Sequence, residues 1–123
     1  MTVPNYILFY VDNPSVSKAF YTPLLEQSPV EDSPTFVLYV LPSGVKFGLW
    51  GRHTVEPAFA SQMGGCELGF QVEDRNAVQA LYAEWGKRGL RIAQAPCEMD
   101  FGYTFVALDP DGHRLRVLAL EMP

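Results

Sequence analysis

The sequence predicts an α+β fold made of two copies of a strand–helix–strand–strand–strand (βαβββ) unit. The segment 6–13 (YILFYVDN) matches the segment 68–75 (LGFQVEDR) at an offset of 62 residues, and in both an apolar strand ends in aspartate before a helix begins. Three strand-like segments follow each helix, with a turn containing proline and glycine before the last of them. The chain therefore divides into repeat one at 1–50, a linker at 51–65 and repeat two at 66–123.

Repeat one begins with an apolar strand that leads into a helix, expected from Pro14 to about Leu24. Asn13 can cap this helix, and proline suits its first position. Pro23 is expected to fray the helix or end it early. The later strands of repeat one are expected at Pro29–Glu31, Thr35–Leu41 and Val45–Trp50.

Repeat two follows the same plan. Its helix is expected from Arg75 or Asn76 to Lys87, and Gly89 follows as a stop signal. Apolar residues at helical spacing form a stripe that includes Trp85, which we expect in the core. The later strands of repeat two are expected at Arg91–Ala95, Tyr103–Leu108 and Arg114–Leu120.

Composition excludes several classes of function. The 123 residues, 48% hydrophobic and 19% charged, suit one compact globular domain. A net charge of −5 argues against binding to nucleic acid, which needs a basic surface. No apolar run approaches the ~20 residues that cross a bilayer, and no secretory signal pattern opens the chain. We therefore expect a cytoplasmic protein that binds neither nucleic acid nor membrane.

Cysteines and histidines do not form a metal-binding pattern. Cys66 and Cys97 each lie beside an expected strand and are best interpreted as free thiols. His53 and His113 are far apart in the sequence and fall in expected loops or turns. Zinc sites need several such ligands at characteristic spacing. The sequence therefore predicts no metal and no cofactor.

The hairpin at 109–117 (DPDGHRLRV) combines turn residues with an alternating strand. Together with the repeat, it resembles the last hairpin of the vicinal-oxygen-chelate superfamily, which contains glyoxalases, bleomycin-resistance proteins and extradiol dioxygenases. The resemblance implies a single domain over 1–123, in which paired βαβββ units form curved mixed sheets around a cavity. It also implies that a homodimer completes this architecture.

Metal-using members of this superfamily hold their ligands at four strand positions, which correspond here to Asn5, Gly48, Glu67 and Arg116. Those members have a glutamate where this chain has Arg116, and a guanidinium carries only N–H donors. The remaining carboxylate and amide do not make a divalent site. Glu67 and Arg116 are interpreted instead as an ion pair or hydrogen-bonded couple. We expect neither a metal nor a catalytic residue.

Strand alternation predicts which side chains share the cavity face. Those expected there are Asn5, Ile7, Phe9, Lys46, Gly48, Trp50, Glu67, Gly69, Gln71, Arg114 and Arg116. Their neighbours Tyr6, Leu8 and Tyr10 are expected to face the helix. The glycines should leave room above the sheet for an aromatic guest that lies against Trp50.

Several roles remain open at this level. Trp50 ends a strand before the polar linker, so it serves either as a ligand platform or in packing at the rim or a dimer contact. For Phe101 and Tyr103 two roles are equally favoured: part of the cavity wall, or packing at an interface. Arg116 either holds a carboxylate of the ligand or pairs internally with Glu67.

Short aromatic motifs narrow the resemblance further. The segments 47–50 (FGLW), 84–85 (EW) and 100–105 (DFGYTF), with Arg116 in the last strand, resemble phenazine-antibiotic-resistance proteins of this superfamily. The resemblance implies a homodimer that sequesters a planar aromatic molecule without turnover and so confers resistance. The predicted ligand-binding residues are Trp50, Arg116, Phe9, Phe101, Tyr103, Glu67, Gln71 and Gly48.

Two other functions stay open. The first is a glyoxalase-like or dioxygenase-like lyase or isomerase, with an unusual metal site or none, in which a desolvated Glu67 acts as general base. The second is a subunit or regulator whose cavity is vestigial and whose role is protein contact.

Overall fold

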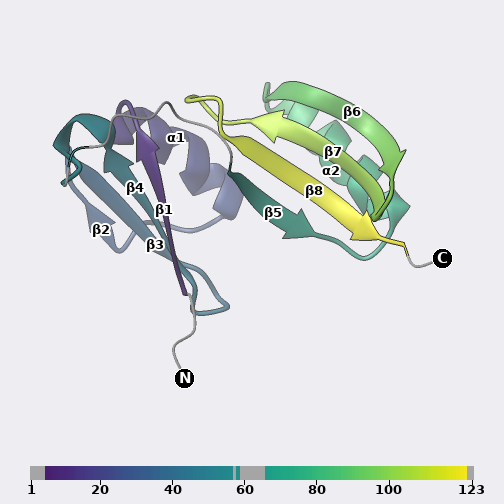
Figure 1. The fold of residues 1–123 in the computed structure, drawn as a ribbon, viewed down its shortest axis with the longest axis horizontal. Coiled ribbons are helices and arrows are strands. Elements are labelled where there is room, and N and C mark those ends of the chain that lie inside the picture. Colours follow the sequence, from purple (N-terminus) through teal and green to yellow (C-terminus); the bar gives the residue numbers. More distant parts are fainter. Residues whose placement is uncertain (1–4, 57, 59–65, 122–123) are drawn as a thin grey trace. The chain divides into compact units, whose positions relative to one another are not determined.

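The computed structural model describes residues 5–56, 58 and 66–121, and contains the two predicted βαβββ units (Figure 1). The first unit comprises β1 (Tyr6–Val11), α1 (Pro14–Leu25), β2 (Glu31–Asp32), β3 (Phe36–Val40) and β4 (Lys46–Gly51), followed by a short 3-10 helix at Arg52–Thr54. The second comprises β5 (Glu67–Gln71), α2 (Arg75–Lys87), β6 (Arg91–Met99), β7 (Gly102–Leu108) and β8 (Arg114–Leu120). The predicted α+β class is confirmed.

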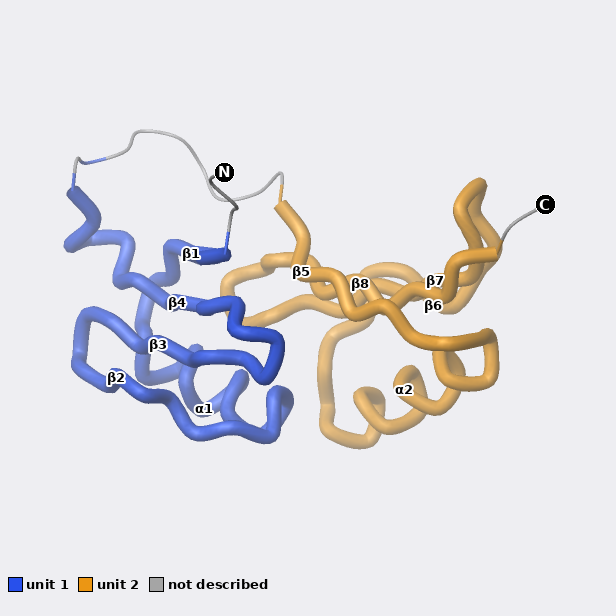
Figure 2. Tube along the Cα trace, turned by 90° about the horizontal axis from the view of Figure 1, so that it is seen from below, with its two compact units in different colours: residues 1–63 blue, residues 64–123 orange. Residues whose placement is uncertain are grey.

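The chain forms two compact units, residues 1–63 and 64–123 (Figure 2). Each contains a mixed sheet of four strands, in the order β1-β4-β3-β2 in unit one and β5-β8-β7-β6 in unit two. The first strand of each unit runs parallel to the last, and the other pairings are antiparallel. A single helix covers one face of each sheet and leaves the other face open within its unit.

Aromatic side chains fill the core of unit one between α1 and its sheet. Tyr21 of α1 meets Phe47 edge-on, with 5.0 Å between ring centroids. Phe9 meets Phe47 in the same way at 5.2 Å, and Tyr39 stacks on Phe47 from β3 at 6.2 Å. All four rings are buried. Edge-on and offset contacts of this kind stabilise a core beyond the area that they bury.

Unit two has an equivalent core beneath α2. Trp85 is buried, as the sequence predicts, and its ring lies edge-on to Phe70 of β5 and Phe105 of β7 at 5.4 and 5.5 Å. Leu115 and Val117 of β8 are fully buried on the same side of the sheet. Within the described residues, neither helix has the length and apolar character needed to cross a bilayer.

Several element boundaries differ from the prediction, among them those of α1, β2 and β6. Helix α1 continues past Pro23 to Leu25 and ends where Glu26 adopts a left-handed conformation, with φ of 54°. Strand β6 extends to Met99 rather than to Ala95, and the register shift between Gln94 and Cys97 accommodates Pro96 inside the strand. Strand β2 is shorter than expected and covers only Glu31–Asp32.

The two repeats are related by an offset of 61 residues rather than 62. Asn13 caps α1 and Asp74 caps α2, so these two residues are equivalent, whereas the sequence comparison had aligned Asp12 with Asp74. In the strands, Tyr6 pairs with Lys46 as Glu67 pairs with Arg114, and Leu8 pairs with Gly48 as Gly69 pairs with Arg116. A shift of one residue exchanges the two faces of a strand. The predicted orientation of β1 is therefore inverted.

Ser17 lies on the buried side of α1, and its hydroxyl has no hydrogen-bond partner among the described residues. A buried hydroxyl without a partner costs about 1–3 kcal/mol, and alanine is the better helix former. The Ser17→Ala variant should therefore keep or raise the melting temperature, measured by circular dichroism.

Asn13→Ala is the matched control on the same helix. Asn13 Oδ1 accepts the backbone N–H of Ser15 at 3.0 Å, and the loss of such a cap costs about 1 kcal/mol. A drop in melting temperature for Ser17→Ala as large as that for Asn13→Ala would contradict this account of the α1 interior.

Candidate functional site

The open face of unit one carries an apolar pocket of about 330 Å³, lined by Tyr6, Leu8, Phe36 and Trp50. The pairings of β1 and β3 with β4 place these four side chains on the face opposite α1. Tyr6 and Leu8 are 44% and 42% exposed, which is high for large apolar side chains. Exposed apolar surface of this kind is typical of faces that contact a ligand or another protein.

Trp50 is held in place by neighbouring rings. Tyr10 and Phe36 each meet it edge-on, with ring centroids at 6.2 and 6.4 Å. The ring is half-buried and lines the pocket, and whether it serves as a platform or in rim packing stays a prediction. The sequence did not identify Tyr6, Leu8 or Phe36 as pocket residues. The helix-capping residue Asn13 was the signal that could have placed Tyr6 and Leu8 on this face.

Gly48 does not leave the predicted empty space. A Cβ atom built on it would lie 2.7 Å from Leu8 Cδ2 and 3.0 Å from the ring of Phe36. These two side chains already cover the strand at this point, and Gly48 is buried. Gly69 in unit two differs from Gly48, since a Cβ atom built on Gly69 would have Leu118 Cδ2, at 4.0 Å, as its only neighbour within that distance among the described residues. The prediction of free space is therefore wrong for Gly48.

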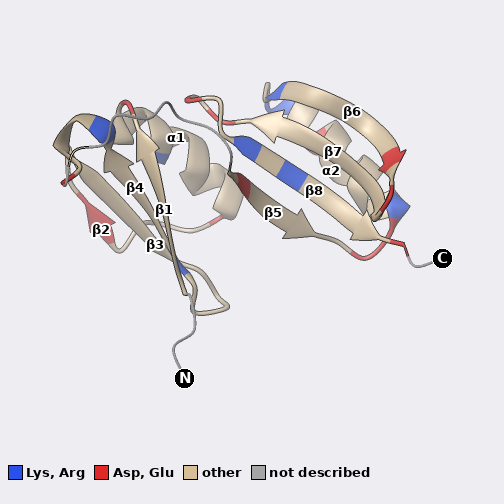
Figure 3. Cartoon of the chain, viewed as in Figure 1, with Lys and Arg blue, Asp and Glu red and all other residues tan. Residues whose placement is uncertain are grey.

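The open face of unit two is polar, and the pair Glu67–Arg116 occupies it. Arg116 Nε donates to Glu67 Oε2 at 2.9 Å, and Arg116 Nη2 donates to Oε1 at 3.1 Å. The two groups thus form a bidentate ion pair between neighbouring parallel strands. Figure 3 shows the basic residues of β8 beside the acidic start of β5.

The guanidinium of Arg116 has further partners. Its Nη1 donates to Thr104 Oγ1 at 3.2 Å and to Gln94 Oε1 at 3.4 Å, and its carbon lies 5.8 Å from the ring centroid of Phe101. The side chain is only 16% exposed. A carboxylate of a ligand would therefore have to compete with Glu67 for Arg116. Thr104 and Gln94 were not identified from the sequence.

The hydrogen bonds from Arg116 hold the pKa of Glu67 below its ordinary value of 4.5, an effect larger than the opposing effect of burial. The nearby charges of Arg116 and Arg114 lower this pKa further. Glu67 is therefore ionised at neutral pH, with both oxygens accepting hydrogen bonds. A carboxylate in this state is a weak general base.

A second pocket, of about 190 Å³, lies on this open face. Its lining residues are Ala93, Gln94, Val106, Arg114 and Arg116. Strand pairing puts Gln94 of β6 and Arg116 of β8 on either side of Val106 of β7, which explains how these side chains meet.

Two of the predicted ligand-binding residues face the helix instead. Phe9 is 3% exposed and packs in the core of unit one, so its predicted cavity-facing orientation is wrong. Tyr103 points toward α2, where its hydroxyl accepts a hydrogen bond from Gln79 Nε2 at 2.6 Å and Arg75 lies over its ring at 4.7 Å. Its assignment to a cavity wall is wrong for the same reason.

The remaining predicted residues lie apart from these. Phe101 lies beside Arg116, and Gln71 is exposed at the end of β5. Asn5 is exposed and precedes β1, where its backbone carbonyl accepts the N–H of Lys46 at 2.9 Å. By register, Tyr6 rather than Asn5 is the counterpart of Glu67.

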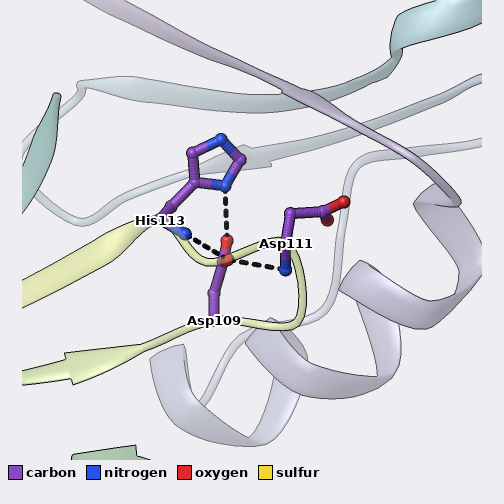
Figure 4. Close-up of side chains that lie close together, drawn as sticks. All are labelled: Asp109, Asp111 and His113. Carbon is purple, nitrogen blue, oxygen red and sulfur yellow. Dashed lines mark hydrogen bonds and ion pairs between the residues drawn. The ribbon is translucent and has the colours of Figure 1, made fainter. Parts of the chain in front are cut away.

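One group of potential metal ligands, Asp109, Asp111 and His113, lies in the β7–β8 turn (Figure 4). Asp109 Oδ1 accepts the backbone N–H groups of Asp111 and His113 at 2.9 and 2.8 Å, and its Oδ2 lies 2.8 Å from His113 Nδ1. Both oxygens of this buried carboxylate thus serve the turn itself. These contacts give the group a structural role in shaping the hairpin.

The residues at the superfamily's ligand positions do not fit a divalent cation. By register they are Tyr6, Gly48, Glu67 and Arg116. Glycine offers no side chain, arginine has no lone pair to donate, and Arg116 engages both oxygens of the single carboxylate.

Comparison with known protein families shows to which family the chain belongs. The family model described as "Glyoxalase/Bleomycin resistance protein/Dioxygenase superfamily" matches residues 3–117. The chain belongs to this superfamily. A curated relative, the phenazine antibiotic resistance protein EhpR of Enterobacter agglomerans, is 31% identical over 125 residues, covering 96% of this chain and 92% of the relative.

Solved structures agree with the fold. A protein from Agrobacterium tumefaciens, determined by NMR in solution, shares 52% identity and a TM-score of 0.90, covering 99% of this chain and 100% of the other. A glyoxalase-related enzyme from Fulvimarina pelagi shows a TM-score of 0.80 at 20% identity, over 97% of this chain and 88% of the other. At that identity the likeness shows the fold alone.

The Glu67→Gln variant tests the ion pair. Loss of the charge leaves the largely buried Arg116 without its counterion, which should cost about 1–2 kcal/mol at pH 7. Because the folded-state pKa of Glu67 lies below 4.5, this stabilisation is complete above about pH 4.5 and is lost as the pH falls through the folded-state pKa. The gap in melting temperature between wild type and variant should therefore narrow under acid conditions.

Glu84→Gln is the control, since it breaks an exposed pair on α2 in which Arg88 Nη2 lies 3.1 Å from Glu84 Oε1. Exposed helical pairs contribute about 0.3–0.5 kcal/mol. Equal losses of melting temperature in the two variants, or a gap that widens as the pH falls, would contradict the account.

Proposed function

We propose that this protein binds and sequesters a planar aromatic small molecule, such as a phenazine-type antibiotic, without converting it, and thereby confers resistance. The observation that carries the proposal is the aromatic pocket of Tyr6, Leu8, Phe36 and Trp50 on the open face of unit one. The relative EhpR, named as a phenazine antibiotic resistance protein, supports the same ligand class.

The chemistry of this pocket suits a flat, apolar guest. Among the described residues, Trp50 has edge-on contacts with Tyr10 and Phe36 and no stacked ring, so its face can serve as a platform. The walls of the pocket are apolar, with the Tyr6 hydroxyl as a polar group. Binding sites for small aromatic molecules combine apolar walls with a few polar groups that fix orientation.

The open face of unit two supports binding rather than turnover. Glu67 would be the general base of the alternative lyase or isomerase function, but its lowered pKa and its bidentate pair with Arg116 make it a poor one. Arg116 is itself engaged by Glu67, Thr104 and Gln94. We therefore expect Arg116 and Glu67 to shape the binding face without reacting.

The proposal includes a homodimer that acts in the cytoplasm and needs no cofactor. Large apolar side chains of the open face in unit one, among them Tyr6, Leu8 and Val40, are exposed within the chain. A second copy of the chain would cover part of such a surface and shield a bound ligand from water. Analytical ultracentrifugation would measure this association.

Tryptophan fluorescence tests the binding site. The Trp85→Phe variant removes the buried tryptophan and leaves Trp50 as the only one in the chain. Titration of this variant with phenazine-1-carboxylic acid should quench the emission saturably, and the ligand released by denaturation should be chemically unchanged. Trp50→Ala in the wild-type background should weaken binding at least roughly tenfold, measured by isothermal titration calorimetry.

Trp50→Phe should restore most of the affinity, because phenylalanine keeps an aromatic face. Val30→Ala, which truncates another exposed apolar residue of unit one, should leave the affinity unchanged. If the Trp50→Ala variant binds the ligand as tightly as the Val30→Ala variant does, Trp50 is not the stacking platform. If the released ligand is a new compound, the protein is an enzyme.

A further inference from the structure

The pocket on the open face of unit two has a character that the aromatic pocket lacks. Its lining combines apolar Ala93 and Val106 with the polar side chains of Gln94, Arg114 and Arg116. A cavity of about 150 Å³ can hold a benzene ring, so the volume of about 190 Å³ is sufficient for one ring that carries a small substituent. Ala93 and Val106 provide apolar surface for that ring.

The charged groups around this pocket do not cancel. Arg116 is neutralised by its bidentate pair with Glu67. Arg114 Nη1 lies 4.0 Å from Glu67 Oε1, at the outer limit of an ion pair, and its side chain is 61% exposed. Two guanidinium groups thus share one carboxylate, which leaves a local charge of +1 in a chain whose net charge is −5.

The groups of this pocket that can still hydrogen-bond to a ligand are mainly donors. The acceptors Gln94 Oε1 and Thr104 Oγ1 already receive Arg116 Nη1, and both oxygens of Glu67 receive Arg116 Nε and Nη2. Among the described residues, Gln94 Nε2 makes only a 3.8 Å contact with Met99 Sδ, and Arg114 has only its 4.0 Å contact with Glu67, so the donors of both side chains can serve a ligand. A site that offers donors and positive charge selects an acceptor that carries negative charge.

We propose that this pocket binds a small organic carboxylate, with Arg114 as its anchor. Arg114 donates to the carboxylate, Gln94 Nε2 supplies a further donor, and the apolar part of the ligand lies on Ala93 and Val106. Arg116 orients Gln94 through the hydrogen bond to Oε1 and keeps its own pair with Glu67. This site is argued from residues of unit two alone, and its test does not use Trp50.

Benzoate and benzamide make a direct comparison, because they share the ring and differ in charge. Titration of the ¹⁵N-labelled full chain should show saturable shifts of the backbone amides of β6 and β8 around Gln94 and Arg114 with benzoate. Benzamide and sodium sulfate at equal concentration should cause at most small, non-saturating changes. The Arg114→Gln variant should bind benzoate at least roughly tenfold more weakly, because a charge-assisted hydrogen bond is lost.

Arg88→Gln is the matched control, since it removes one positive charge from an exposed arginine of the same unit. It should bind benzoate as the wild type does, and Arg114→Lys should recover part of the affinity. Equal binding of benzoate and benzamide by the wild type, shifts confined to unit one, or equal weakening by Arg114→Gln and Arg88→Gln would each overturn the proposal.

Discussion

The ion pair between Glu67 and Arg116 is the interaction on which the open face of unit two depends. It joins the parallel strands β5 and β8, and it fixes the guanidinium so that its remaining nitrogen reaches Thr104 and Gln94. One side chain thereby orders groups from four strands of the sheet. It also lowers the pKa of the Glu67 carboxyl group, which is therefore ionised at neutral pH.

This ion pair lies within the fold of the glyoxalase/bleomycin-resistance/dioxygenase superfamily, to which the chain belongs. The scaffold retains two βαβββ units, each with one sheet face left open by its helix. Within unit one that face is apolar and aromatic around Trp50, and within unit two it is polar and net cationic around Arg114. These faces are the basis of the binding roles proposed for the two units.

The fold followed from the sequence because the repeat, the helix caps and the turns agree locally. The facing of β1 did not, because Asp12 precedes the capping Asn13 by one residue and a one-residue shift inverts a strand. This error assigned Phe9 to the ligand and placed Tyr6 and Leu8 on the helix side, whereas Phe36 of β3 was not identified for a separate reason, since no motif marked it. Tyr103 was assigned to the wrong face of the sheet because an aromatic residue in β7 can pack on either face. Its contacts with Gln79 and Arg75 place it on the helix side.

The central claim is that Glu67 forms an ion pair with Arg116 and does not hold a divalent cation. Equilibrium dialysis of the purified protein against Zn²⁺, Ni²⁺ and Mn²⁺ at neutral pH, followed by elemental analysis, tests it most directly. The account predicts substoichiometric metal in the wild type, unchanged by Glu67→Gln. One tightly held ion per chain that disappears in Glu67→Gln would show that Glu67 is a metal ligand and would contradict the account.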